Sequence, residues 1–174
     1  MDGPAVGKTR HEQSVRAQMK LGDFFSKEAI IPELKATDRN GVIRELTASL
    51  AAAGGLDPDQ VEAVARAVIA RENQGSTGFG KGVAVPHAKH HAVKRMIASI
   101  GRTGTGVDFA ALDRAPVYIV MLLLSPTDNP DGHLAAMESI FKQLQRDNFR
   151  RFLRQSETKE EIAELIDEAD AMAS

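Results

Sequence analysis

Residues 117–124, "VYIVMLLL", constrain the fold of this chain more than any other segment. The run is apolar on both faces of an extended strand, whereas a strand with one face in water alternates apolar and polar residues. Such a run is typical of a strand at the centre of a sheet that helices cover on both sides. It is also far shorter than the roughly 18 apolar residues of a membrane span. We therefore expect a buried central strand and no direct membrane insertion.

Four other segments carry apolar residues at helical spacing. The helices that they predict begin near residues 38, 58, 131 and 158. Asp57-Pro58 supplies a carboxylate cap followed by a proline in the first turn, and Thr158 with Glu161 resembles a capping box. Further strand-like runs occur at residues 83–85 and 96–103, with a candidate strand at 29–34.

The order of these elements predicts a single α/β domain, with a mixed β-sheet flanked by helices on both faces. No repeat or Pro/Ser-rich linker interrupts residues 21–170, and we place the domain at residues 21–174. Residues 1–20 mix charges and lack the apolar centre of a signal peptide, so they are interpreted as a flexible N-terminal extension.

Composition excludes several functions. The formal charge of −2 gives no broad basic field, which argues against nucleic-acid binding through many phosphate contacts. The chain has no cysteine, so it has neither a disulfide nor a thiolate nucleophile or ligand. These features fit a cytoplasmic protein.

The segment "GKGVAVPHAKHH", residues 80–91, holds three of the five histidines. Pro86 is suited to the end of a strand, so His87 is predicted to lie where the sheet stops. A glycine-rich loop, residues 73–82, precedes it, and backbone amides of such loops can bind anions. His87 can then be a hydrogen-bonded structural histidine, a metal ligand with His91 at helical spacing, or a nucleophile toward phosphorus.

Two further residues favour an anion site. Arg71 lies at the predicted end of the helix before the glycine-rich loop, where its guanidinium can fork onto phosphoryl oxygens. His133 lies in the first turn of a predicted helix, whose amides and dipole favour an anion. Taken alone, each is as readily a solvated surface residue. Their convergence with His87 is the stronger hypothesis.

Two segments, "RENQGSTGFGKGVAVPHAK" and "HLAAMESIFKQL", resemble the enzyme IIA domains of the mannitol–fructose class of the phosphoenolpyruvate-dependent phosphotransferase system, including the nitrogen-regulatory members. The resemblance covers roughly residues 20–170. It implies that His87 is the phosphorylated histidine, His133 the second active-site histidine and Arg71 the active-site arginine. Phe79 and Lys81 stand where aliphatic and small polar residues are common in the family.

The resemblance further implies a phosphotransferase that works through a phosphohistidine. We expect no cofactor or metal, because the chain has no cysteine and no convincing set of histidine and carboxylate ligands accompanies His87. The donor would be a histidine phosphocarrier protein, and the acceptor a IIB domain or, in the regulatory alternative, a target protein bound according to phosphorylation state. Arg71 and His133 would balance the phosphoryl charge. A third alternative is metal hydrolysis through His87, His91 and His133, which lacks an assignable carboxylate. The identity of a sugar, if one is involved, is not encoded in these motifs.

Overall fold

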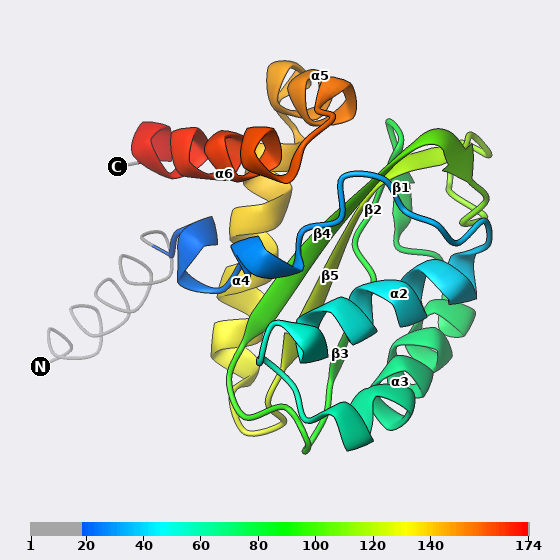
Figure 1. Cartoon of the computed structure of the whole chain (residues 1–174), viewed down its shortest axis with the longest axis vertical. Helices are drawn as coiled ribbons and strands as arrows, with labels where there is room; N and C mark the ends of the chain where they lie inside the picture. The colour runs from blue at the N-terminus through cyan, green and yellow to red at the C-terminus, as the bar shows by residue number, and fades with distance from the viewer. Residues whose placement is uncertain (1–18, 174) are drawn as a thin grey trace, which may run out of the picture.

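Strand β5, Val117–Ser125, lies inside a five-stranded mixed sheet. The computed structural model of the chain describes residues 19–173 (Figure 1). Strands β2 (Val83–Ala84) and β3 (His87–Lys89) pair parallel with one edge of β5, while β4 (Ile97–Val107) pairs antiparallel with the other. The short strand β1 (Gly78–Gly80) pairs antiparallel with β2. The predicted central strand and the mixed sheet are confirmed.

Helices cover both faces of this sheet, as predicted (Figure 1). One face carries α2 (Arg39–Ala52) and α3 (Val61–Gln74). The other carries α4 (Pro130–Leu144), α5 (Asp147–Gln155) and α6 (Lys159–Ala173). Residues 19–173 also contain three short 3-10 turns: η1 (Leu21–Asp23), η2 (Lys27–Ala29) and η3 (Pro58–Gln60).

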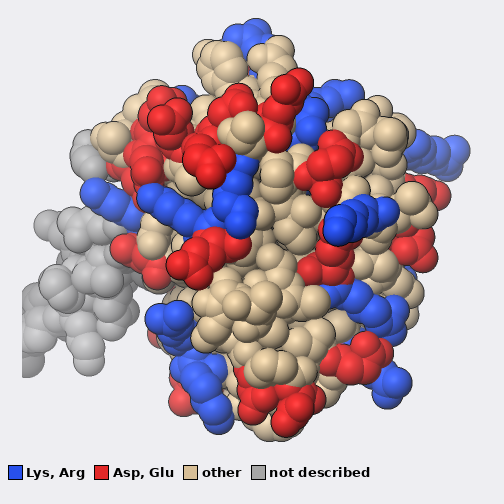
Figure 2. Space-filling view, viewed as in Figure 1, with Lys and Arg blue, Asp and Glu red and all other residues tan. Residues whose placement is uncertain are grey.

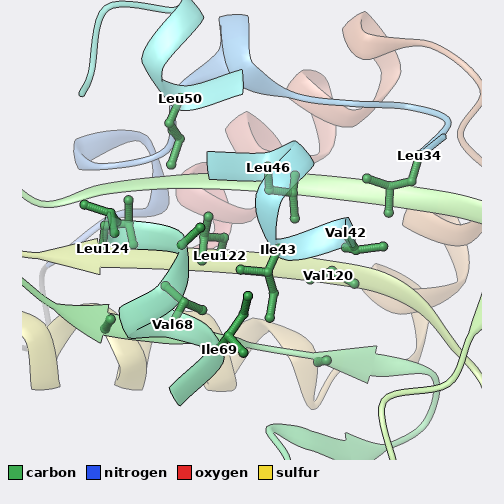
Figure 3. Packing of buried hydrophobic residues seen from close by; sticks show 14 of the residues in the cluster. Leu34, Val42, Ile43, Leu46, Leu50, Val68, Ile69, Val120, Leu122 and Leu124 are labelled. Atoms are coloured by element: carbon green, nitrogen blue, oxygen red, sulfur yellow. The ribbon is translucent and has the colours of Figure 1, made fainter. Parts of the chain in front are cut away.

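Strand β5 divides its side chains between two hydrophobic cores. Leu122 and Leu124 pack under α2 and α3, where Figure 3 shows them beside Ile43 and Val68. Met121 and Leu123 point to the opposite face and pack with residues of α4, α5 and α6. Because successive side chains of a strand alternate between faces, an apolar run without alternation needs both layers of helices.

Side-chain caps mark the starts of α2, α6 and α4. The predicted cap Asp57 instead precedes the 3-10 turn η3, and α3 begins at Val61 without a side-chain cap. The Asp38 side chain accepts a hydrogen bond from Gly41 N at 3.0 Å, and the Thr158 hydroxyl accepts one from Glu161 N at 3.1 Å. At α4, the side chain of Asn129 accepts from Gly132 N at 3.1 Å, with Pro130 in the first turn. Capping satisfies amides that have no partner within the helix. The cap at Asn129 fixes where α4 begins.

The candidate strand at residues 29–34 was wrong. This segment forms only an isolated bridge between Ile31 and Gly101, with hydrogen bonds from Ile31 N to Ile100 O and from Leu34 N to Arg102 O. The next amide that bonds to β4 after Ile31 belongs to Leu34 and not to Glu33, so the pairing shifts by one residue and no regular ladder continues.

Within residues 19–173, no helix is both long and apolar enough to span a membrane. Acidic and basic side chains are interspersed on the face shown in Figure 2, without a continuous basic field. Residues 1–18 of the predicted N-terminal extension lie outside the described residues, so that assignment stays a prediction.

Candidate functional site

His87 is the first residue of β3 rather than a residue beyond the end of the sheet. Pro86 does not stop the sheet, because its carbonyl still accepts a hydrogen bond from Leu123 N at 3.0 Å. Strands β2 and β3 thus follow the same edge of β5 on either side of the proline. Pro86 interrupts the donor pattern of this edge strand and leaves its acceptor in place.

The imidazole of His87 is held by one backbone contact. Its Nδ1 lies 2.8 Å from the carbonyl oxygen of Val85. A carbonyl oxygen can only accept a hydrogen bond, so Nδ1 carries the proton and Nε2 keeps its lone pair. No hydrogen bond to Nε2 is formed by the residues that the structure describes. Nε2 is the nucleophilic atom of this ring.

The structure brings His133 beside His87. Their ring centroids lie 5.4 Å apart, with an interplanar angle of 52°. His133 sits in the first turn of α4, and its Nδ1 lies 2.7 Å from the hydroxyl of Ser125 at the end of β5. The end of the central strand and the start of α4 therefore place the second ring against the first.

Both histidines line an open cavity of about 610 Å³. Its other walls are side chains of α4 and the residue that follows it: Leu134, Met137, Glu138, Phe141, Lys142 and Gln145. Phe79 of β1 packs edge-on against Phe141, with ring centroids 5.2 Å apart. The unusual aromatic residue at position 79 thus braces a wall of this cavity.

The surroundings keep both rings neutral near pH 7. Burial is the main cause that lowers the pKa of His87 below its ordinary value. The charges of Arg71 and Lys89 lower this pKa further. The Val85 carbonyl and the charge of Glu72 act in the opposite direction and raise it. Burial, with smaller contributions from His87 and Lys89, lowers the pKa of His133 to about 4. A neutral His87 has the lone pair that attack on phosphorus requires.

Arg71 lies near the C-terminus of α3, as predicted, but its hydrogen bond is with the loop. Its Nη1 donates to the carbonyl oxygen of Gly75 at 3.0 Å. Its charge reaches His87 electrostatically and lowers the pKa of that ring, although Arg71 does not line the cavity of the two histidines. The remaining guanidinium donors make no hydrogen bond within the described residues.

Glu72 was not among the predicted site residues. It is 2% exposed, and its carboxylate accepts from Thr77 N at 2.7 Å and from the Thr77 hydroxyl at 2.8 Å. It therefore ties the glycine-rich loop to α3, and its charge raises the pKa of His87. The sequence carried a signal for it, because Glu72 continues the apolar stripe of Ala65 and Val68 at helical spacing.

No group of three His, Cys, Asp or Glu side chains within residues 19–173 is arranged to hold a metal ion. The ring of His91 instead stacks on His90, with centroids 4.3 Å apart. The metal-hydrolysis alternative has no ligand set in this part of the chain.

A larger cavity, of about 780 Å³, lies away from the two histidines between α5 and the turn at Lys81. Its arginines are already engaged: Arg150 pairs with Asp147, and Arg154 lies 3.6 Å above the ring centroid of Tyr118. It contains none of the three predicted site residues, whereas His87 and His133 line the cavity of about 610 Å³.

Comparison with known proteins finds relatives both in sequence and in fold. A family model described as "Phosphoenolpyruvate-dependent sugar phosphotransferase system, EIIA 2" matches residues 23–169. The chain is 33% identical over 153 residues to the nitrogen regulatory protein of Escherichia coli, covering 87% of this chain and 92% of that protein. It is 32% identical over 152 residues to the fructose-specific EIIABC component of Bacillus subtilis, where it spans 87% of this chain but only 24% of the relative.

Solved structures show the same fold. The nitrogen regulatory protein IIA-Ntr of Neisseria meningitidis is 27% identical, with a TM-score of 0.74 over 84% of this chain and 98% of that one. Mannitol IIA of Escherichia coli, solved in complex with phosphorylated mannitol IIB, is 21% identical, with a TM-score of 0.69 over 83% and 99% of the two chains. With the family match over residues 23–169, these findings show that the chain belongs to the EIIA 2 family of the phosphoenolpyruvate-dependent sugar phosphotransferase system.

Proposed function

We propose that this protein is a histidine phosphocarrier that accepts a phosphoryl group on Nε2 of His87 from a histidine phosphocarrier protein. The observation that carries the proposal is the hydrogen bond from Nδ1 of His87 to the Val85 carbonyl, which leaves Nε2 with a lone pair at the cavity. The family match supports it, because proteins of this family act as phosphocarriers.

In the transfer step, the bond between phosphorus and the donor's imidazole nitrogen breaks, and its electron pair returns to that nitrogen. The Nε2 lone pair of His87 forms the new bond to phosphorus. Nδ1 keeps its proton, and the Val85 carbonyl stabilises the positive charge that the ring gains. No proton has to be moved, so the site contributes position and electrostatics.

The charges of the phosphoryl group need partners around His87. Arg71 supplies the nearest positive charge on the α3 side, since its charge already acts on the imidazole. His133, whose ring lies 5.4 Å away, supplies a neutral ring on the α4 side. In this proposal Arg71 and His133 stabilise the phosphoryl group without carrying it.

The cavity wall also fits a protein partner. Leu134 is 48% exposed, and it shares the rim with Met137 and Phe141. Exposed apolar residues around a reactive group are typical of docking surfaces. The mannitol IIA of similar fold is solved with a phosphorylated IIB partner, which supports a IIB domain as the acceptor here.

A regulatory role is the second candidate, and one observation favours it. The chain is 33% identical over 153 residues to the nitrogen regulatory protein of Escherichia coli, and other nitrogen regulatory proteins match it at 31–36% identity. In this role the phosphorylated and unphosphorylated forms would differ in which target protein they bind.

A two-stage experiment separates the candidates. Rapid-quench mixing with the phosphorylated phosphocarrier protein measures loading of His87, and a chase with an isolated IIB domain measures onward transfer. Loading followed by onward transfer is expected for a transport component, and loading without transfer to a panel of IIB domains for a regulator. Absence of loading from any phosphorylated phosphocarrier protein would contradict both roles.

A further inference from the structure

Ser125 is a buried polar residue at the site with no part in the chemistry described so far. It is the last residue of β5, is 0% exposed, and pairs in register with Lys89 of β3. Its carbonyl accepts a hydrogen bond from His90 N at 3.0 Å, so the backbone at Ser125 is held on the β3 side. Its hydroxyl oxygen lies 2.7 Å from Nδ1 of His133.

The direction of this hydrogen bond follows from what each atom can do. A buried hydroxyl that fails to donate loses its hydrogen bonds to water without replacement. Within the described residues, Nδ1 of His133 is the only acceptor that the Ser125 hydroxyl contacts. The hydroxyl therefore donates to Nδ1, and neutral His133 must carry its proton on Nε2.

The two neighbouring rings are thus held in opposite tautomers. The Val85 carbonyl places the proton of His87 on Nδ1, while the Ser125 hydroxyl places the proton of His133 on Nε2. One ring presents a lone pair and the other an N–H donor. A phosphoryl group on Nε2 of His87 has oxygens that need donors, and a neutral imidazole with Nε2–H is one.

We propose that Ser125 is a positioning residue that holds His133 in its Nε2–H tautomer and ring orientation, so that His133 donates a hydrogen bond to the phosphoryl group on His87. The inference rests on the proposed phosphocarrier function. The tautomer of His133, however, is a property of the unphosphorylated protein, so it can be tested before any phosphoryl group is added.

The chain offers a matched control. Ser99 on β4 is also a serine with 0% exposure, and its hydroxyl donates to a single acceptor, Ala29 O, at 2.7 Å. Ser99→Ala therefore removes the same atom from the same sheet away from the two histidines. Ser125→Thr retains the hydroxyl and serves as the conservative variant.

The primary measurement is the ¹⁵N spectrum of the histidine side chains at pH 7, assigned with His133→Gln. In wild-type protein we expect His133 as the pure Nε2–H tautomer and His87 as the Nδ1–H tautomer. Ser125→Ala should shift the His133 nitrogen signals toward a tautomer mixture, whereas Ser99→Ala should leave them unchanged. A wild-type His133 with its proton on Nδ1 would overturn the inference.

The second measurement is single-turnover loading from the phosphorylated phosphocarrier protein. Loss of one neutral hydrogen bond predicts a rate roughly two- to tenfold lower in Ser125→Ala, with recovery in Ser125→Thr and no change in Ser99→Ala. Wild-type spectra and rate in Ser125→Ala would refute the positioning role. If instead the spectra behave as expected but no variant is ever loaded, the tautomer assignment holds and the phosphocarrier function fails.

Discussion

At the residue scale, a single hydrogen bond orients each of the two imidazoles at the site. His87 and His133 each have one hydrogen bond through Nδ1, to Val85 O and to the Ser125 hydroxyl. In both rings, Nε2 therefore points away from the group that Nδ1 contacts. Neither the Val85 carbonyl nor the Ser125 hydroxyl could be predicted as a partner from the sequence. Every residue has a backbone carbonyl, and Ser125 is simply the residue that follows an apolar run.

In the proposed transfer, Arg71 stabilises the phosphoryl group and also lowers the pKa of His87. Substitution of Arg71 tests both effects. Its loss should lower the rate of phosphoryl transfer roughly ten- to hundredfold, the effect of about 1.5–3 kcal/mol from a charge-assisted hydrogen bond. Arg71→Lys should recover part of the rate, because an ammonium keeps the charge but loses the forked geometry. Single-turnover loading measures both variants.

The pH dependence gives a second signature of Arg71. The reactive form of His87 is neutral, so the rate falls as pH drops through the pKa of His87. Because the Arg71 charge lowers that pKa, Arg71→Ala should move the fall to higher pH, and Arg71→Lys should not. Arg66→Ala, an exposed arginine on the same helix that pairs with Glu62, is the control. An unchanged rate profile in Arg71→Ala would make Arg71 a bystander.

At the element scale, the glycine-rich loop is attached to α3 by a buried carboxylate. Glu72→Ala leaves Thr77 N and the Thr77 hydroxyl without their acceptor, which should cost about 1–3 kcal/mol of unfolding free energy. Urea denaturation measures this loss, and amide exchange at Thr77 should accelerate. Glu62→Ala on the exposed face of α3 should change stability much less, because solvent screens its ion pairs. Equal effects of the two substitutions would contradict this account.

The elements also show how far sequence reasoning reaches. Helices α2, α3, α4 and α6 were predictable because apolar spacing and capping residues agree. Helix α5 was missed, because it buries only Phe149 and Leu153 in a short segment rich in arginine. The error at residues 29–34 came from a one-residue shift in backbone pairing after Ile31, which apolar content does not reveal. The error after β2 came from placing the end of the sheet at Pro86, although the Pro86 carbonyl still bonds to β5.

At the scale of the whole molecule, two layers of helices bring residues from distant segments to one site. The motif around residue 87 and the helix start at residue 133 predicted candidate groups, and the structure confirms that their rings are neighbours. The contact of Ser125 with His133 could not be predicted, since it depends on where the loop between β5 and α4 folds back. The roles of His87, His133 and Arg71 remain predictions.

The buried histidines also make the stability of the fold depend on pH. His133 has a pKa of about 4 in the folded chain, below its ordinary 6.5. Between these values the unfolded chain binds a proton that the folded chain does not, so stability falls as pH decreases through this window and the loss is complete below pH 4. His87 contributes in the same direction.

Urea midpoints at pH 7 and pH 5 measure this effect. The midpoint should be lower at pH 5 in the wild type, and the difference should shrink in His133→Asn, which has no group that titrates in this range. A pH dependence that is the same in both proteins would show that His133 does not control it.

In the proposed function, His87 carries the phosphoryl group. The direct measurement is incubation of wild type, His87→Ala and His90→Ala with phosphoenolpyruvate, enzyme I and the phosphocarrier protein, followed by intact mass and site mapping under non-acidic conditions. We expect one phosphoryl group on His87 in the wild type and in His90→Ala, and none in a folded His87→Ala protein. Undiminished labelling of His87→Ala, or a phosphoryl group mapped to His133, would contradict the account.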